Sequence, residues 1–99
     1  MTRGTTPTHV LTLPFFTDRV AKLRITYKQG DDIVLEKTEG DVKKVGKTLK
    51  YTLTQEETLK FVAGTPVYLQ VRVLTIDNVS LVSPIKKLAV SDVLNKEVL

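Results

Sequence analysis

The chain has 99 residues, of which 41% are hydrophobic and 26% charged, with a net charge of +4 and no cysteine. This length is typical of one domain, and the lack of cysteine excludes disulfide bonds and thiolate zinc ligands. No apolar run approaches the roughly 18 residues that cross a membrane, and the opening residues lack the continuous apolar segment of a signal peptide, so we expect neither.

The first half of the chain alternates apolar and polar residues with the period of half-buried strands. The polar opening, residues 1–8, is predicted to be a flexible arm before a single domain of residues 9–99. Strands are expected at His9–Leu13, Lys22–Lys28, Ile33–Lys37, Val42–Val45 and Lys47–Leu53. In the second and third of these, the side chains expected to face the core are Leu23, Ile25, Tyr27, Ile33 and Leu35.

A short helical element is expected between the two halves. Thr54 and Glu57 have the spacing of a capping box, which predicts one short helical turn near Gln55–Lys60. Five or six residues are too few for a helix that is stable alone, so this turn should serve as a crossover between strands. Phe61 then returns to the core.

The second half is predicted to end in a long hairpin. Val67–Thr75 is the longest alternating stretch, Asp77-Asn78 fits a two-residue hairpin loop, and Ser80–Val90 returns. Pro84 must then lie at a bulge or on a sheet edge, because it has no backbone N–H. About seven short strands with this spacing predict an all-β fold, an antiparallel immunoglobulin/fibronectin-like β-sandwich.

No group of residues carries a recognisable reaction mechanism. His9 is the only histidine, and spacing assigns it no nucleophile or carboxylate partner, so we expect a structural or solvated role. Glu56 and Glu57 are neighbours on a helical turn and point about 100° apart, so they do not flank one bond. We therefore expect no enzyme, no cofactor and no metal site.

Two surfaces could bind a partner. Tyr68, Gln70, Arg72 and Leu74 alternate along the outer face of the long strand and include residue types that anchor protein contacts. Either a partner docks on this face, or the face covers a neighbouring strand.

The second surface is a basic stripe that could bind phosphates. Its predicted members are Arg24, Lys43, Lys44, Lys47 and Lys50. Reading bases also requires exposed aromatic side chains, and Tyr27 and Tyr51 fall on inward positions. We therefore favour a solvated strand face over a nucleic-acid site.

Several segments resemble a family of small virion-associated proteins encoded by phages and prophages of Gram-positive bacteria. They are RGTTPTHVLTLPF (Arg3–Phe15), LRITYKQGDDIVLEK (Leu23–Lys37), LTQEETLKF (Leu53–Phe61) and VYLQVRVLTIDNVSLVS (Val67–Ser83). More distantly, the arrangement is similar to the N-terminal β-domain of phage baseplate upper proteins. One departure is that the related hairpin turns read Asp-Gly, whereas Val79 follows Asn78 here.

The resemblance implies a non-enzymatic structural or adaptor protein of a phage particle, associated with the tail or baseplate and acting by protein–protein contact. Its expected partners are other virion proteins and further copies of itself. Its expected location is the cytoplasm of the bacterial host during assembly, and then the virion. The alternative is a binding module for an extended ligand, either single-stranded nucleic acid or carbohydrate. No catalytic residues follow from the resemblance.

Overall fold

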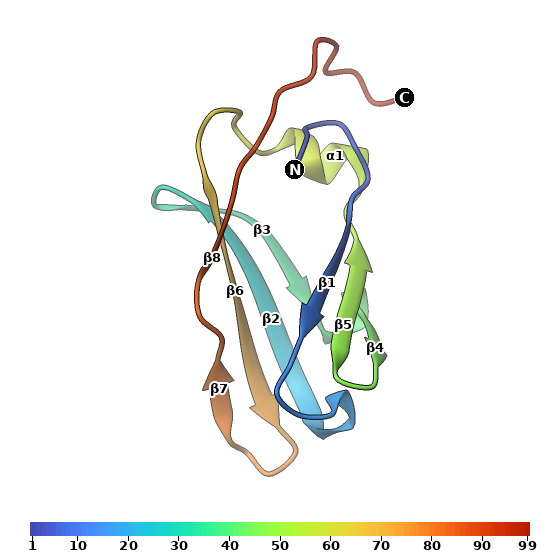
Figure 1. Cartoon of the computed structure of the whole chain (residues 1–99), viewed down its shortest axis with the longest axis vertical. Coiled ribbons are helices and arrows are strands. Elements are labelled where there is room, and N and C mark those ends of the chain that lie inside the picture. Colours follow the sequence, from blue (N-terminus) through green and yellow to red (C-terminus); the bar gives the residue numbers. More distant parts are fainter.

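Two antiparallel sheets face each other across one apolar core in the computed structural model, which describes residues 1–99 (Figure 1). The smaller sheet has the order β1-β5-β4, and the larger has β3-β2-β6 with β7 and β8 both on the free edge of β6. The bounds are β1 Thr8–Thr12, β2 Val20–Gln29, β3 Asp32–Thr38, β4 Lys43–Val45, β5 Thr48–Thr52, β6 Val67–Thr75, β7 Ser80–Val82 and β8 Lys86–Leu88. The predicted all-β antiparallel fold is confirmed, with eight strands instead of about seven.

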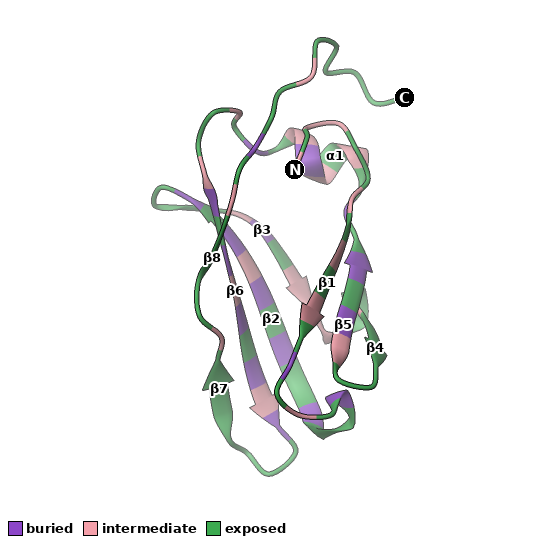
Figure 2. Cartoon of the chain, viewed as in Figure 1, coloured by how far each residue is buried: buried purple, intermediate pink, exposed green.

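The core is built from the alternating side chains of both sheets (Figure 2). Along β6, for example, Val67, Leu69, Val71 and Val73 are buried, while the residues between them are exposed or half-buried. Fifteen buried apolar side chains form one cluster between the layers. The outward-pointing residues of β6 are therefore free to form a surface.

The single α-helix closes one end of the sandwich (Figure 1). α1 spans Gln55–Leu59, and the predicted capping box is confirmed: the Thr54 hydroxyl accepts from the Glu57 backbone N–H, and the Glu57 carboxylate accepts from the Thr54 N–H. Lys37 Nζ on β3 lies 2.5 Å from Glu57 Oε2 in a largely buried pair. This pair ties the helix to the larger sheet. The chain also forms two 3₁₀ turns, at Thr17–Arg19 and Glu39–Asp41.

The predicted inward orientation of Ile33 is wrong, because the β2–β3 ladder contains a bulge. Tyr27 pairs with Leu35, but the next residue, Lys28, pairs with Ile33, which leaves Val34 without a partner. The extra residue moves Ile33 to the outside, where 58% of it is exposed.

In the last hairpin, the predicted loop is wrong and the predicted position of Pro84 is confirmed. The Thr75 backbone N–H donates to the Val79 carbonyl, so the loop is Ile76–Asn78, with Asn78 alone at positive φ (64°), and the predicted two-residue loop is wrong. Pro84 lies on the edge between β7 and β8, as predicted, and it divides the expected Ser80–Val90 strand into two short ones.

The opening residues 1–8, predicted to be a flexible arm, make specific contacts near the other end of the chain. The Met1 ammonium group donates to the Ala89 carbonyl at 2.9 Å, and Arg3 Nη1 lies 2.9 Å from Asp92 Oδ1. The mobility of this segment stays a prediction.

Candidate functional site

A groove of about 690 Å³ lies on the outer face of the larger sheet. We call it the outer-sheet groove. It runs across β2, β3, β6 and β7, and its lining combines charged, neutral polar and apolar side chains. The lining residues are Leu23, Arg24, Thr26, Lys28, Glu36, Tyr68, Gln70, Arg72, Val73, Leu74, Ser80 and Ile85.

The structure brings together all four residues of the predicted contact face. Tyr68, Gln70, Arg72 and Leu74 line the outer-sheet groove from one strand, because they occupy the outward positions of β6. Tyr68 is 40% exposed, and the Gln70 side-chain amide donates to the Ser83 carbonyl at 3.0 Å. No neighbouring strand covers this face, since β2, β7 and β8 pair with β6 within the sheet plane.

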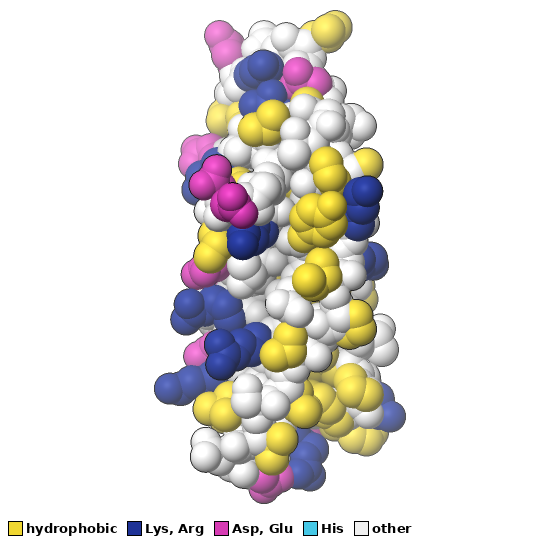
Figure 3. Space-filling view, turned by 90° about the vertical axis from the view of Figure 1, so that its left-hand side faces the viewer, with side chains coloured by type: hydrophobic (Ala, Val, Ile, Leu, Met, Phe, Trp, Pro, Cys, Tyr) yellow, Lys and Arg dark blue, Asp and Glu magenta, His cyan; other side chains and the backbone are white.

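Positive charge dominates the outer-sheet groove. Arg24 on β2 stands directly opposite Arg72 on β6 in the ladder. Tyr68 of β6 has a lysine opposite it on each side: Lys28 on β2 and Lys87 on β8. Figure 3 views the β7–β8 side of the molecule and shows basic side chains gathered on one flank beside scattered apolar ones.

The predicted basic stripe does not form as one surface. Arg24 lies on the larger sheet, whereas Lys43, Lys44 and Lys50 lie on β4 and β5 of the smaller sheet. Lys43 stands opposite Lys50, so these two share a face.

Lys47, the remaining member of the stripe, lies in the β4–β5 turn. Its ammonium group lies 5.0 Å from the ring centre of Phe16, which is largely exposed. The predicted stripe is therefore divided: its lysines belong to the smaller sheet and its β4–β5 turn, whereas Arg24 lines the outer-sheet groove.

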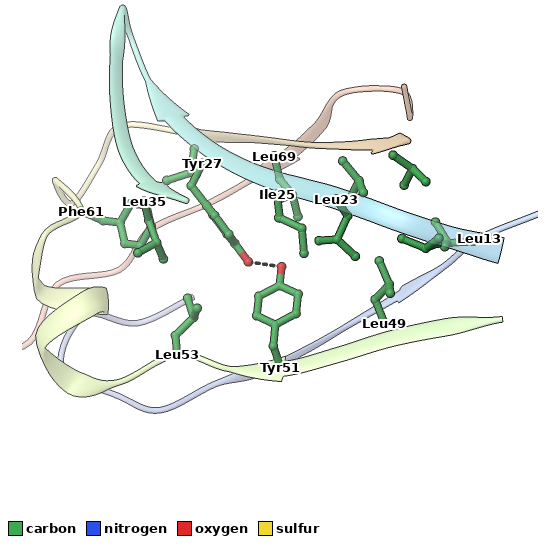
Figure 4. Packing of buried hydrophobic residues seen from close by; sticks show 14 of the residues in the cluster. Leu13, Leu23, Ile25, Tyr27, Leu35, Leu49, Tyr51, Leu53, Phe61 and Leu69 are labelled. Carbon is green, nitrogen blue, oxygen red and sulfur yellow. Dashed lines mark hydrogen bonds between the residues drawn. The ribbon is translucent and has the colours of Figure 1, made fainter. Parts of the chain in front are cut away.

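A buried polar network crosses the core, and the sequence did not indicate it. His9 Nδ1 on β1 lies 2.5 Å from the Tyr27 hydroxyl on β2, and that hydroxyl also hydrogen-bonds the Tyr51 hydroxyl on β5. Figure 4 shows Tyr27 and Tyr51 pointing toward each other between the sheets. The inward positions of both tyrosines were predictable, but the spacing of residues along the chain does not reveal that the ladder places His9 opposite Tyr51.

The electrostatics of this network favour neutral groups. Burial raises the pKa of Tyr27 far above its ordinary value and raises the pKa of Tyr51 to about 12. Burial, with the N-terminal ammonium group and Lys86 nearby, lowers the pKa of His9. The three side chains therefore link the two sheets as uncharged hydrogen-bonding partners at neutral pH.

Protonation of His9 should weaken the fold. Because the folded pKa of His9 lies below its unfolded value of 6.5, the unfolded state binds the proton more tightly. We expect the free energy of unfolding to fall as the pH drops below about 6.5, measured by urea denaturation at a series of pH values. The variant His9→Gln should lack this step and keep only the loss at lower pH caused by carboxylates. Identical profiles for both proteins from about pH 7 to about pH 5 would contradict this assignment.

No three or more His, Cys, Asp or Glu side chains are grouped so that they could hold a metal ion. None of the helices has the length and apolar character needed to cross a bilayer. Comparison of the chain with protein-family models, with curated proteins and with solved structures finds no match.

Proposed function

We propose that this chain is a non-enzymatic adaptor domain that acts by protein–protein contact through the outer-sheet groove. The observation that carries the proposal is the groove itself, in which Tyr68, Leu74 and Ile85 supply apolar area beside arginines. Tyrosine and arginine are the residue types that most often dominate binding energy at protein interfaces.

The biological setting of the proposal comes from the sequence. The resemblance of Arg3–Phe15 and the later segments to virion-associated proteins supports a structural role in a phage particle, at the tail or baseplate. The partners would be other virion proteins, including further copies of this chain, met in the host cytoplasm during assembly and kept in the virion. The facing three-stranded and five-stranded antiparallel sheets support placing the domain among immunoglobulin/fibronectin-like sandwiches.

The proposal predicts which surface substitutions remove the partner. Tagged wild-type protein should recover other virion proteins from infected cells, and mass spectrometry should find the chain in purified particles. Tyr68→Ser plus Leu74→Ser should reduce partner recovery roughly tenfold or more, since loss of a central anchor costs about 2 kcal/mol or more.

The matched control changes two apolar residues on the outer face of the smaller sheet. Val10→Ser plus Val45→Ser alters side chains that are 54% and 53% exposed, and partner recovery should stay at the wild-type level. A chain that is absent from purified particles, or equal recovery with both double variants, would refute the proposal.

A second candidate function has one specific observation in its favour. Lys43 and Lys50 share a face of the smaller sheet, and Phe16 is an exposed aromatic side chain beside Lys47. Cationic groups around an aromatic platform are typical of single-stranded nucleic-acid sites. Retention of the protein on an oligonucleotide column, lost on Lys43→Glu plus Lys50→Glu, would favour this function, and no retention at low salt would exclude it.

A further inference from the structure

The outer face of the larger sheet carries an unbalanced positive charge. The ladder places five outward cationic residues on β2, β6 and β8, where residues that stand directly opposite share a face. They are Lys22, Arg24, Lys28, Arg72 and Lys87. Glu36 is the only carboxylate that lines the outer-sheet groove.

The arrangement of these charges is unfavourable for the isolated domain. Arg24 and Arg72 are directly opposite each other, and like charges in this position destabilise a sheet. Arg24 Nη1 reaches Glu36 Oε2 only at 3.4 Å, with both side chains substantially exposed, so this pair relieves little of the repulsion. Arg72 makes no ion pair in the structure. An anionic partner would satisfy both guanidinium groups.

We propose that the outer-sheet groove binds an acidic, extended segment of a partner protein, whose carboxylates pair with Arg24 and Arg72. This inference rests on the proposed function and names the chemistry of its partner. Planar guanidinium groups bind carboxylates through paired hydrogen bonds, which gives the contact orientation as well as charge.

The spacing of the cationic residues fits an extended peptide that runs along the strands. Arg24 and Arg72 form one cross-strand level, and Lys28 and Lys87 flank Tyr68 at another, four residues further along β2. Four residues of strand span about 13 Å. Carboxylates four positions apart in an extended peptide therefore meet both levels.

The apolar part of the groove favours a protein segment over a nucleic acid. Tyr68 is the only aromatic residue in the lining, so successive bases would find no series of stacking platforms. Leu74 and Ile85 instead offer contacts for apolar side chains of a peptide. The Glu36 carboxylate can also accept a backbone N–H of a peptide, a donor that a nucleic-acid backbone lacks.

The test uses a fluorescent synthetic peptide of alternating glutamate and valine, with fluorescence anisotropy as the readout. Wild-type protein should bind it, more weakly as salt is added, and a peptide with glutamine in place of glutamate should bind at least roughly tenfold more weakly. Arg24→Gln plus Arg72→Gln should weaken binding of the glutamate peptide by a similar factor. The melting temperature of this variant should not fall, because the substitution removes a like-charge pair.

The matched control is Lys43→Gln plus Lys50→Gln, which removes the same charge from the smaller sheet and should leave peptide affinity unchanged. Equal losses with both double variants would overturn the proposal, because binding would then follow net charge alone. Tighter binding of a single-stranded oligonucleotide than of the peptide at the same sites would also overturn it. If the glutamate peptide does not bind while Tyr68→Ser plus Leu74→Ser still removes the virion partner, the proposed function is retained and the proposal of an acidic partner segment is rejected.

Discussion

Replacement of Phe61 with alanine should lower the free energy of unfolding by about 3–5 kcal/mol. Phe61 is 1% exposed, and the centre of its ring lies 5.8 Å from the centre of the Tyr27 ring. It follows α1, at the point where the chain re-enters the core. Removing the ring costs its transfer free energy and leaves a cavity that the two sheets cannot fill. A domain of this size has only about 5–15 kcal/mol of total stability, so the variant should be largely unfolded under mild denaturing conditions.

Urea denaturation followed by circular dichroism measures this effect, and Phe16→Ala is the control. Phe16 is 58% exposed and contacts Lys47 at the surface, so its loss should cost less than about 1 kcal/mol. Equal destabilisation by the two substitutions would contradict the position of Phe61 in the core.

The substitution Tyr27→Phe should lower the free energy of unfolding by about 1–3 kcal/mol, although it removes a single oxygen atom. The Tyr27 hydroxyl is the middle of the core network, so its loss leaves both His9 Nδ1 and the Tyr51 hydroxyl without that partner. Tyr51→Phe should cost less, because the Tyr27 hydroxyl then still bonds His9.

A double-mutant cycle tests whether the Tyr27 and Tyr51 hydroxyls stabilise the fold together or independently. Once Tyr27 is phenylalanine, the Tyr51 hydroxyl is already unpaired, so adding Tyr51→Phe should cost little and could recover stability. The free energies of unfolding of the four proteins, from urea denaturation at neutral pH, give the coupling energy. Additive costs for the two substitutions would show that the hydroxyls do not act together.

Local periodicity predicts the elements of this fold well. The alternation of Val67–Thr75 predicts both the strand and its buried face, because side chains on opposite faces of a sheet meet opposite environments. The capping box at Thr54 likewise predicts where α1 begins, since both of its hydrogen bonds are local.

Errors in the sequence-based prediction arise where a partner strand decides the outcome. Ile33 alternates correctly within its own strand, yet a bulge in the ladder with β2 moves it outward. Gln29 precedes a Gly-Asp-Asp sequence that is typical of a turn, yet it lies at the end of β2 and is buried. Its side-chain amide donates to the carbonyls of Val62 and Thr65 and accepts from the Val62 N–H. Neither the bulge that turns Ile33 outward nor the hydrogen bonds of Gln29 can be predicted from the residues that are adjacent in the sequence.

The candidate site likewise has a part that one strand alone predicts and a part that depends on which strands pair. That Tyr68, Gln70, Arg72 and Leu74 share a face follows from one strand alone and was predictable. That Arg24 stands opposite Arg72, and not beside Lys43, depends on which strands become neighbours in each sheet. The groove and its charge imbalance therefore become visible only when the register of β2 against β6 is known.

The interruption at Pro84 has a consequence for behaviour at high concentration. An unbroken outer strand would present a continuous row of free N–H and C=O groups that could recruit other chains into fibrils. Here that border consists of β7 and β8, three residues each, separated by a proline that cannot donate. This edge of the larger sheet is therefore a poor template for amyloid growth, even with exposed Leu81, Val82 and Ile85 along it.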